Sequence, residues 1–360
     1  MKIKHRGVVM NYAVIGGGNT GQAIASYLAL NEQEVKLYTR DEKRAEKISD
    51  NGLELKGVYS GYINLKAYTS MDAVIKGAEV IIISTTAIGH KPILRELRPI
   101  LEENQTIVFI PGYWAAVEAK QILGDVIENK NLTIAETSAQ PFISNADDNG
   151  SVSVRRIKNN VLVSTLSRSD KQPELSSAFL EMFPHLVTSN NIFETSLNNS
   201  NVVVHVPISL FNASRIDEAD PFEFYPDGVS RLTVKYVEKV DDERRRIADL
   251  FKVETKDILT ILNDFYDTEY QNLYEALPEL FPEGKGPTTV DHRYFTEDIP
   301  FGLVAVSEIA KKAGVETPFT DSLINTTSLF TGVNYRQEGV NLENITFEEL
   351  ASYGGISVKA

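Results

Sequence analysis

The chain has 360 residues, 42% of them hydrophobic and 24% charged, which is typical of a globular protein large enough for two domains. Its formal net charge of −14 argues against a nucleic-acid partner, because phosphate binding needs concentrated Lys and Arg. An anionic substrate would therefore be held by a local basic site. Cysteine is absent, which excludes disulfides, thiolate nucleophiles and Cys-bound metals, and we expect no metal cofactor.

The first ten residues are basic at their start but lack a following apolar segment and a small-residue cleavage site. The longest apolar run, around 80–83, is far too short to span a membrane. We therefore expect a cytoplasmic protein without a membrane partner.

Short apolar runs alternate with helix-like segments in the first half of the chain. Helices are predicted at 22–30 and 41–50, and strands at 12–15, 34–38, 80–84, 106–110, 132–136 and 161–164. The uninterrupted apolar run at 80–84 is typical of a parallel strand that is covered on both faces. This order predicts an α/β domain with a doubly wound, mostly parallel sheet.

The pattern changes at about residue 190, where strand-like runs fade and helical patterns dominate. Helices are predicted at 240–251, 256–277, 302–313 and 320–331, with prolines between several of them. The sequence thus predicts a dinucleotide-binding domain over 1–190 and a mostly α-helical substrate domain over 191–360.

A glycine loop lies between the first predicted strand and the first predicted helix, with Gly16, Gly18 and Gly21 in the spacing GxGxxG. The first glycine permits a tight turn, the second lets the backbone approach a pyrophosphate, and the third lets helix pack on strand. Asn19 and Thr20 belong to the same loop, and we expect them to contact the dinucleotide as well. The alternative is a glycine-rich turn that serves packing alone.

The end of the second predicted strand indicates which dinucleotide is preferred. Thr39 and Arg40 occupy the positions where an acid would hold the ribose 2′-hydroxyl of NAD, and Lys43 and Arg44 follow closely. This favours NADP, with NAD as the other possibility. In that alternative, Arg40 is a solvated loop charge and Asp41 binds the ribose of NAD.

Two segments of the second half carry candidate catalytic residues. His205 lies in an apolar run, and a helix would place Asn201 on the same face. By spacing alone, a histidine in this setting is more often a core residue than a catalyst. Arg293 and Asp298 are expected in a loop that runs into a helix near Phe301. The alternative for this pair is a salt bridge within the loop together with a helix cap.

Together these residue types suit one reaction. Arg293 can hold a carboxylate in a bidentate fork. Asp298 can orient His205, which can exchange a proton with the substrate while hydride moves from a nicotinamide. Two further candidates follow strand ends, where ligands of such sheets bind. His90 could line the nicotinamide site or simply begin a helix, and Glu136 could meet a substrate amino group.

These segments resemble the opine dehydrogenase family, the octopine/nopaline dehydrogenase group. The matching pieces are GGGNTG at 16–21, TTAIGH at 85–90, PG at 111–112, ETSAQPF at 136–142, NVVVHVP at 201–207 and RYFTEDIPFGL at 293–303. Related ketopantoate reductases and glycerol-3-phosphate dehydrogenases use a catalytic lysine in the second half, and the 201–207 segment contains none.

The resemblance implies a Rossmann domain, a helical C-terminal domain and a homodimer. It also implies NAD(P)H-dependent reductive condensation of a 2-oxo acid with the amino group of an amino acid. The family's histidine–aspartate pair falls on His205 and Asp298, its substrate-binding arginine on Arg293 and its asparagine on Asn201. The 142–146 segment departs from the family pattern because it has no basic residue.

Two alternatives stay open. One is a reductase of the same superfamily that acts on a 2-oxo acid without condensing it with an amine. The other is a non-catalytic NADP-binding redox sensor, which predicts that His205→Ala leaves function intact.

Overall fold

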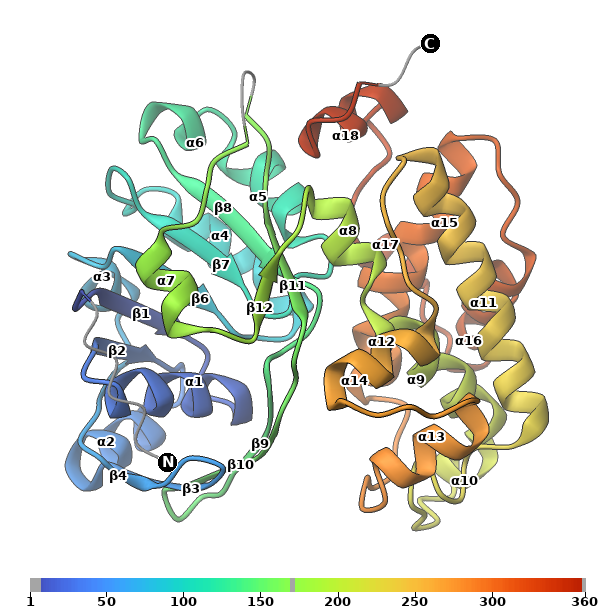
Figure 1. The fold of residues 1–360 in the computed structure, drawn as a ribbon, viewed down its shortest axis with the longest axis horizontal. Coiled ribbons are helices and arrows are strands. Elements are labelled where there is room, and N and C mark those ends of the chain that lie inside the picture. Colours follow the sequence, from blue (N-terminus) through green and yellow to red (C-terminus); the bar gives the residue numbers. More distant parts are fainter. Residues whose placement is uncertain (1–7, 169–171, 358–360) are drawn as a thin grey trace. The chain divides into compact units, whose positions relative to one another are not determined.

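The computed structural model describes residues 8–168 and 172–357, so most of the basic N-terminal segment lies outside the described residues. The chain divides into two compact units, Met1–Ile192 and Phe193–Ala360 (Figure 1). The first is an α/β unit and the second is helical, which confirms the predicted fold class.

The first unit is built around an eight-stranded sheet with the order β12-β11-β8-β7-β6-β1-β2-β5. Neighbouring strands of this sheet are parallel, with one exception: β11 runs antiparallel to β8. Every residue of β6 is buried, as expected of a strand with both faces covered. The strands are β1 (Asn11–Ile15), β2 (Glu34–Tyr38), β5 (Lys66–Tyr68), β6 (Val80–Ile83), β7 (Thr106–Phe109), β8 (Thr133–Thr137), β11 (Val161–Thr165) and β12 (Leu186–Thr188).

Helices connect the strands of this sheet. Their bounds are α1 (Asn19–Leu30), α2 (Glu42–Asn51), α3 (Met71–Ile75), η1 (Ala87–Gly89), α4 (His90–Leu97), α5 (Ala115–Leu123), α6 (Val126–Asn129) and α7 (Ser177–Met182).

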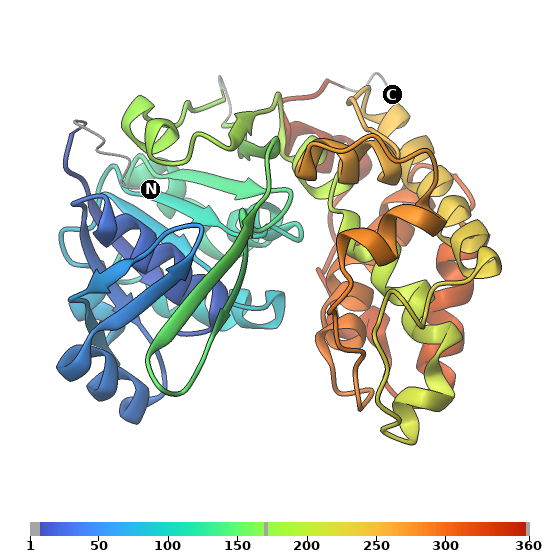
Figure 2. The same ribbon diagram turned by 60° about the horizontal axis from the view of Figure 1, so that its bottom comes forward.

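A second sheet in this unit was not predicted from the sequence. Its order is β4-β3-β10-β9, and its strands are β3 (Leu53–Gly57), β4 (Gly61–Ile63), β9 (Phe142–Ala146) and β10 (Ser151–Ile157). In Figure 2, β9 and β10 form a long green hairpin. Strands of this sheet contact α1, the helix that follows the glycine loop. The second sheet thus supports the helix whose N-terminus faces the expected dinucleotide.

The second unit is built of helices joined by loops, with an isolated β-bridge between Glu223 and Lys285. The helices are α8 (Ile192–Leu197), α9 (Ser200–Phe211), α10 (Ala213–Asp217), α11 (Arg231–Leu250), α12 (Ile258–Tyr266), α13 (Leu273–Leu280), α14 (Arg293–Thr296), the π-helix η2 (Asp298–Leu303), α15 (Val304–Lys312), α16 (Pro318–Thr331), α17 (Tyr335–Glu338) and α18 (Phe347–Tyr353).

Helix α9 is the buried centre of this unit. Its residues from Val202 to Ser209 are all buried, and α11, α12, α14, α16 and η2 contact it. A helix that is apolar on all sides is stable only when neighbours surround it. The side chains from Val202 to Ser209 are therefore shielded from water by the packing of these neighbours.

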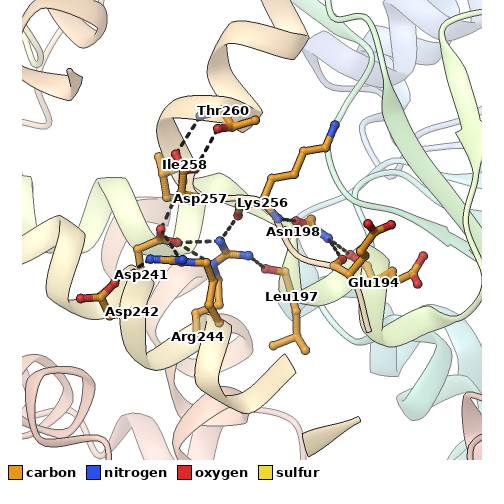
Figure 3. Close-up of polar contacts among 12 residues, drawn as sticks. Glu194, Leu197, Asn198, Asp241, Asp242, Arg244, Lys256, Asp257, Ile258 and Thr260 are labelled. Atoms are coloured by element: carbon orange, nitrogen blue, oxygen red, sulfur yellow. Dashed lines mark hydrogen bonds and ion pairs between the residues drawn. The ribbon is translucent and has the colours of Figure 1, made fainter. Parts of the chain in front are cut away.

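A buried arginine fastens α11 to two neighbouring segments (Figure 3). Arg244 donates to Asp241 from Nε at 2.8 Å and from Nη2 at 2.6 Å, and to the carbonyl oxygens of Leu197 and Lys256. The other carboxylate oxygen of Asp241 accepts from the backbone N–H of Ile258 at 3.2 Å. The buried charges thus have partners on α8 and at the start of α12, as buried ions require.

The structure corrects two predictions for the helical unit. The single helix predicted at 256–277 is two helices, α12 and α13, because Asp267 adopts a left-handed conformation with φ 54° and ends the first. The loop predicted for 293–298 is wrong as well: Arg293 begins α14, and Asp298 begins η2.

Across the described residues, no helix is both long and apolar enough to cross a membrane.

Candidate active site and dinucleotide site

The glycine loop has the geometry that a pyrophosphate site requires. Gly16 has φ 131°, and a Cβ there would lie 2.5 Å from the carbonyl oxygen of Ser84. A Cβ on Gly21 would lie 1.8 Å from the carbonyl oxygen of Gly16, whereas one on Gly18 would meet nothing within 4 Å. Within the described chain, no side chain caps α1 and its first turn carries no acid. The open space at Gly18 and the uncapped helix N-terminus fit the phosphates of NAD(P).

Asn19 and Thr20 connect this loop to the segment around β9. Thr20 Oγ1 donates to Gln140 Oε1 at 2.6 Å, and Asn19 Oδ1 accepts from the backbone N–H of Ala146 at 2.9 Å. Both side chains therefore hold the loop in place, and their contact with the dinucleotide stays a prediction.

The basic residue that reaches the glycine loop is Arg44. Its Nη1 donates to the carbonyl oxygen of Gly17 at 3.2 Å, whereas Arg40 is exposed. Thr39 is buried directly against Gly17, where an added Cβ would lie 2.6 Å from its Oγ1. Asp41 accepts from the backbone N–H of Arg44 at 3.1 Å and so caps α2. The sequence named Arg44 only as a neighbour, because the turn of α2 that brings it back is not visible in spacing alone.

The two candidates at strand ends lie in the interior of the α/β unit. His90 is 0% exposed and packs edge-on against Phe109 at 5.0 Å, and burial lowers its pKa to about 3. Glu136 is fully buried and accepts from the backbone N–H of Ala116 at 3.0 Å, in the first turn of α5. Both positions suit structural roles, and their contact with a substrate stays a prediction.

The structure brings His205 and Asp298 together in the helical unit. His205 projects from the buried helix α9, and Asp298 is the first residue of η2. Nδ1 of His205 lies 2.8 Å from Oδ2 of Asp298, and the residues are 4% and 0% exposed. A buried imidazole and carboxylate at this distance form a strong, charge-assisted hydrogen bond when the ring is protonated.

A tyrosine that the sequence did not indicate contacts the other ring nitrogen. Tyr225 Oη lies 3.1 Å from Nε2 of His205. With Asp298 as a carboxylate, which only accepts, Nδ1 carries the ring proton and Nε2 of the neutral ring accepts from the phenol. Burial raises the pKa of Tyr225 well above its usual value, so the phenol keeps its proton.

Tyr294 connects the imidazole to Arg293. Its ring stacks on His205 at 4.0 Å, and the Arg293 guanidinium carbon lies 5.2 Å from the centre of the same ring. Arg293 Nη1 also lies 3.6 Å from Oε2 of the buried Glu297, and its side chain is 37% exposed. A cation with one face on an aromatic ring and part of its surface open can accept a carboxylate from outside.

His292 lies on the other side of this cluster. Its ring meets Tyr294 edge-on at 4.4 Å. Burial, and then the Arg293 charge, lower the pKa of His292 to about 4. His292 is therefore neutral at neutral pH, and His205 is the histidine with a hydrogen-bonded carboxylate.

Close packing of η2 on α9 fixes the His205–Asp298 distance. A Cβ added to Gly302 would lie 2.4 Å from a methyl group of Val202, so only glycine allows this approach. π-Helices are rare and occur frequently at functional sites. Arg293 lies 3.6 Å from Glu297 and Asp298 bonds to His205, and a salt bridge between Arg293 and Asp298 stays an alternative.

Asn201 lies one turn before His205 on α9 and is half-buried. Its backbone N–H donates to Oδ1 of Asn199 at 3.1 Å, in the cap of the helix. The helix thus places both residues on one face, as the spacing required.

Comparison with known proteins gives consistent matches over most of the chain. The model described as NAD/NADP octopine/nopaline dehydrogenase, alpha-helical domain, matches residues 188–331, and that of ketopantoate reductase PanE/ApbA matches residues 12–127. An opine dehydrogenase of Arthrobacter sp. (strain 1C) is 32% identical, over 95% of this chain and 97% of that protein. A D-nopaline dehydrogenase of Agrobacterium tumefaciens (strain T37) is 25% identical, over 89% and 86%.

A solved octopine dehydrogenase in complex with NADH and agmatine has the same fold, with a TM-score of 0.79 at 19% identity, covering 98% of this chain and 100% of that one. The chain therefore belongs to the opine dehydrogenase family of NAD(P)-dependent oxidoreductases.

Proposed function

We propose that this opine dehydrogenase condenses a 2-oxo acid with the amino group of an amino acid and reduces the product. The observation that carries the proposal is the buried hydrogen bond of 2.8 Å between His205 and Asp298, beside a partly exposed arginine. The bound dinucleotide would supply the hydride from its nicotinamide.

His205 serves as the acid and base of the condensation. Nε2 of the neutral ring takes one proton from the ammonium form of the amino nucleophile. After the amine adds to the carbonyl carbon, a second nitrogen proton moves to the carbonyl oxygen, and the imidazolium returns the first proton to this hydroxyl, which leaves as water. Asp298 stabilises the imidazolium and keeps the proton on Nδ1 when the ring is neutral. The two proton transfers cancel, so the imidazole ends each turnover in its starting state.

Arg293 binds the carboxylate of a substrate. The substrate carboxylate would form a bidentate contact with the guanidinium. This contact would be shorter than the 3.6 Å contact with Glu297 that it replaces. Tyr294 lies against both Arg293 and His205. A carboxylate bound to Arg293 would therefore be separated from His205 by only the Tyr294 ring. Asn201 is a further substrate contact on the same helix face as His205.

NADPH is the preferred dinucleotide in this proposal. Arg44 and Thr39 border Gly17 of the glycine loop, where the adenosine ribose of a bound dinucleotide would lie. No acid takes the position of Thr39, and the nearby Asp41 caps α2. A 2′-phosphate would therefore find a guanidinium beside it.

Replacing Arg44 tests this preference. Arg44→Ala should raise the KM for NADPH strongly and change the KM for NADH little, because only NADPH has the 2′-phosphate. The exposed Arg40 provides the matched control. A larger loss in Arg40→Ala than in Arg44→Ala would assign the phosphate to Arg40 instead.

The proposed reaction is tested by NADPH and NADH oxidation with pyruvate, 2-oxoglutarate or oxaloacetate, each with and without a panel of amino acids. Turnover that requires both substrates supports condensation. Turnover with the oxo acid alone would replace it by simple 2-oxo acid reduction. Dinucleotide binding without turnover in any mixture would favour the sensor.

A further inference from the structure

We propose that Tyr225 relays the proton between Nε2 of His205 and the reacting substrate atom, so that the acid–base device has three members. The inference rests on the proposed function for its substrates. Its geometric part, the contact of Tyr225 with His205, is independent of which substrates are used.

Both nitrogens of His205 point into the protein. Nδ1 faces Asp298 at 2.8 Å, and Nε2 faces Tyr225 Oη at 3.1 Å. The ring faces are covered too, since Tyr294 stacks on the imidazole at 4.0 Å and Phe224 meets it edge-on at 6.0 Å. A proton that leaves or enters the ring at Nε2 therefore meets the phenol oxygen first.

The phenol is held in place by its surroundings. Tyr225 lies in the connection between α10 and α11, stacks on Phe281 at 4.8 Å and meets Phe224 at 4.9 Å. It is 8% exposed, so only a small part of the residue can meet a substrate. Swinging the ring aside would break these aromatic contacts, whereas a relay needs no movement of the ring.

A phenol is chemically suited to this position because its oxygen can donate and accept at once. Burial is the main cause that raises the pKa of Tyr225 well above its usual value. The group therefore does not act as a stored phenolate base. It takes up one proton only as it gives up another.

The relay step balances in both directions. In the acid step, the Nε2–H bond of the imidazolium breaks as a new Oη–H bond forms, the former Oη–H proton moves to the departing hydroxyl oxygen, and the C–O bond breaks to release water. In the base step, the amino nucleophile gives its proton to Oη while the phenol proton moves to Nε2. Tyr225 is a neutral phenol before and after each step.

Tyr225→Phe removes the hydroxyl and keeps the ring that packs against Phe281 and Phe224. In single turnovers with NADPH and both substrates, we expect the rate to fall by roughly 100-fold, the size of a typical general acid–base contribution. The rate in mixtures of H2O and D2O should curve for the wild type, because two protons move together. It should become linear in the variant.

Tyr266→Phe is the matched control, because the Tyr266 ring also contacts Phe281, edge-on at 5.5 Å. It removes a buried phenol hydroxyl from this cluster without touching His205, and should retain wild-type rates. A Tyr225→Phe rate within about threefold of the wild type, or an unchanged curved dependence on D2O, would overturn the relay.

A second measurement does not depend on turnover. The groups that face His205 are Asp298 from η2, Tyr225 from the α10–α11 connection and Tyr294 from α14, with His292 beyond Tyr294. The phenol donates to Nε2 of the neutral ring and accepts from the N–H of the imidazolium, and the second, charge-assisted bond is the stronger. An NMR titration of the His205 ring should therefore move to lower pH in Tyr225→Phe. An unmoved titration would show that the phenol does not bond to Nε2, even if no substrate pair is turned over.

Discussion

At the residue scale, the proposed mechanism requires Asp298 to determine which nitrogen of His205 is available for chemistry. Asp298→Asn places an amide beside Nδ1 and allows the opposite tautomer, with the proton on Nε2. We expect kcat to fall by about 10³- to 10⁴-fold, as in comparable histidine–aspartate pairs, while the affinity for NADPH changes little. Steady-state kinetics and fluorescence titration of NADPH measure the two effects. Equal losses in both would mark Asp298 as a structural residue.

Arg293 is expected to act on substrate binding more than on proton transfer. Arg293→Ala should raise the KM for the 2-oxo acid by about 100-fold, because a charge-assisted bidentate contact of roughly 3 kcal/mol is lost. Arg215 offers a matched control, since it also has a carboxylate partner, Asp220 at 3.4 Å, and an aromatic ring, Phe222 at 4.4 Å. The KM for the 2-oxo acid is measured from saturation curves of the two variants, and it should rise only in Arg293→Ala. An unchanged KM in Arg293→Ala would remove this residue from the site.

The packing of η2 on α9 sets the site geometry at the element scale. Gly302→Ala adds a methyl group that would lie 2.4 and 2.6 Å from the two methyl groups of Val202. We expect this overpacking to cost about 1–3 kcal/mol of unfolding free energy and to separate Asp298 from His205. Activity should therefore fall by more than the loss of folded protein explains.

The steric origin of this effect can be checked within the same contact. Val202→Ala combined with Gly302→Ala removes the clashing methyl groups and should restore activity relative to Gly302→Ala alone. Denaturant unfolding and kcat of the single and double variants form the test. A double variant that is no better than the single one would attribute the loss to the helix conformation of η2 itself.

The elements that the sequence predicted well are those whose signals are local. The first strand, the glycine loop and the following helix are contiguous, so hydrophobic periodicity and turn chemistry identify them together. The second sheet was not predicted because its strands pair over a long distance in sequence: Ser151 in β10 pairs with Glu54 in β3. The end of α12 was not predicted because the residue that ends it in a left-handed conformation is Asp267, and not the glycine that usually indicates a helix end.

The site shows the same division. The residues His205 and Asp298 are 93 positions apart, and no periodicity pairs them. The chemistry of the two residue types suggested the pair, and resemblance to a family supported it. Tyr225 was missed because its segment, Phe224-Tyr225-Pro226-Asp227-Gly228, has the composition of a turn, and nothing in a turn sequence shows which distant side chain its tyrosine meets.

Buried titratable groups make the stability of the whole molecule depend on pH. His90 and His292 have pKa values lowered by burial to about 3 and about 4, from an ordinary 6.5. Between pH 6.5 and these values the unfolded chain binds protons that the folded chain does not. Each histidine thus lowers the unfolding free energy as pH falls, by at most about 1.4 kcal/mol per pH unit.

Glu118 acts in the opposite direction. Burial raises its pKa to about 7 from 4.5, despite the nearby Lys91, so the folded chain keeps a proton that the unfolded chain releases. Its contribution is present below pH 4.5 and is lost as the pH rises towards 7. Between about pH 4.5 and 6.5, acidification lowers the unfolding free energy through two histidines and raises it through one glutamate. From these three groups we therefore expect a net loss of stability as the pH falls through that range.

His90→Leu isolates one of these contributions and tests the role of His90 at the same time. In the described structure neither ring nitrogen of His90 has a hydrogen-bond partner, so an apolar side chain of similar size should be tolerated. The unfolding free energy of the variant, measured by denaturant titration from pH 7 to pH 4.5, should fall less steeply than that of the wild type. If the slope is unchanged and the KM of a substrate rises instead, His90 contacts that substrate and the interior position seen here is not its functional one.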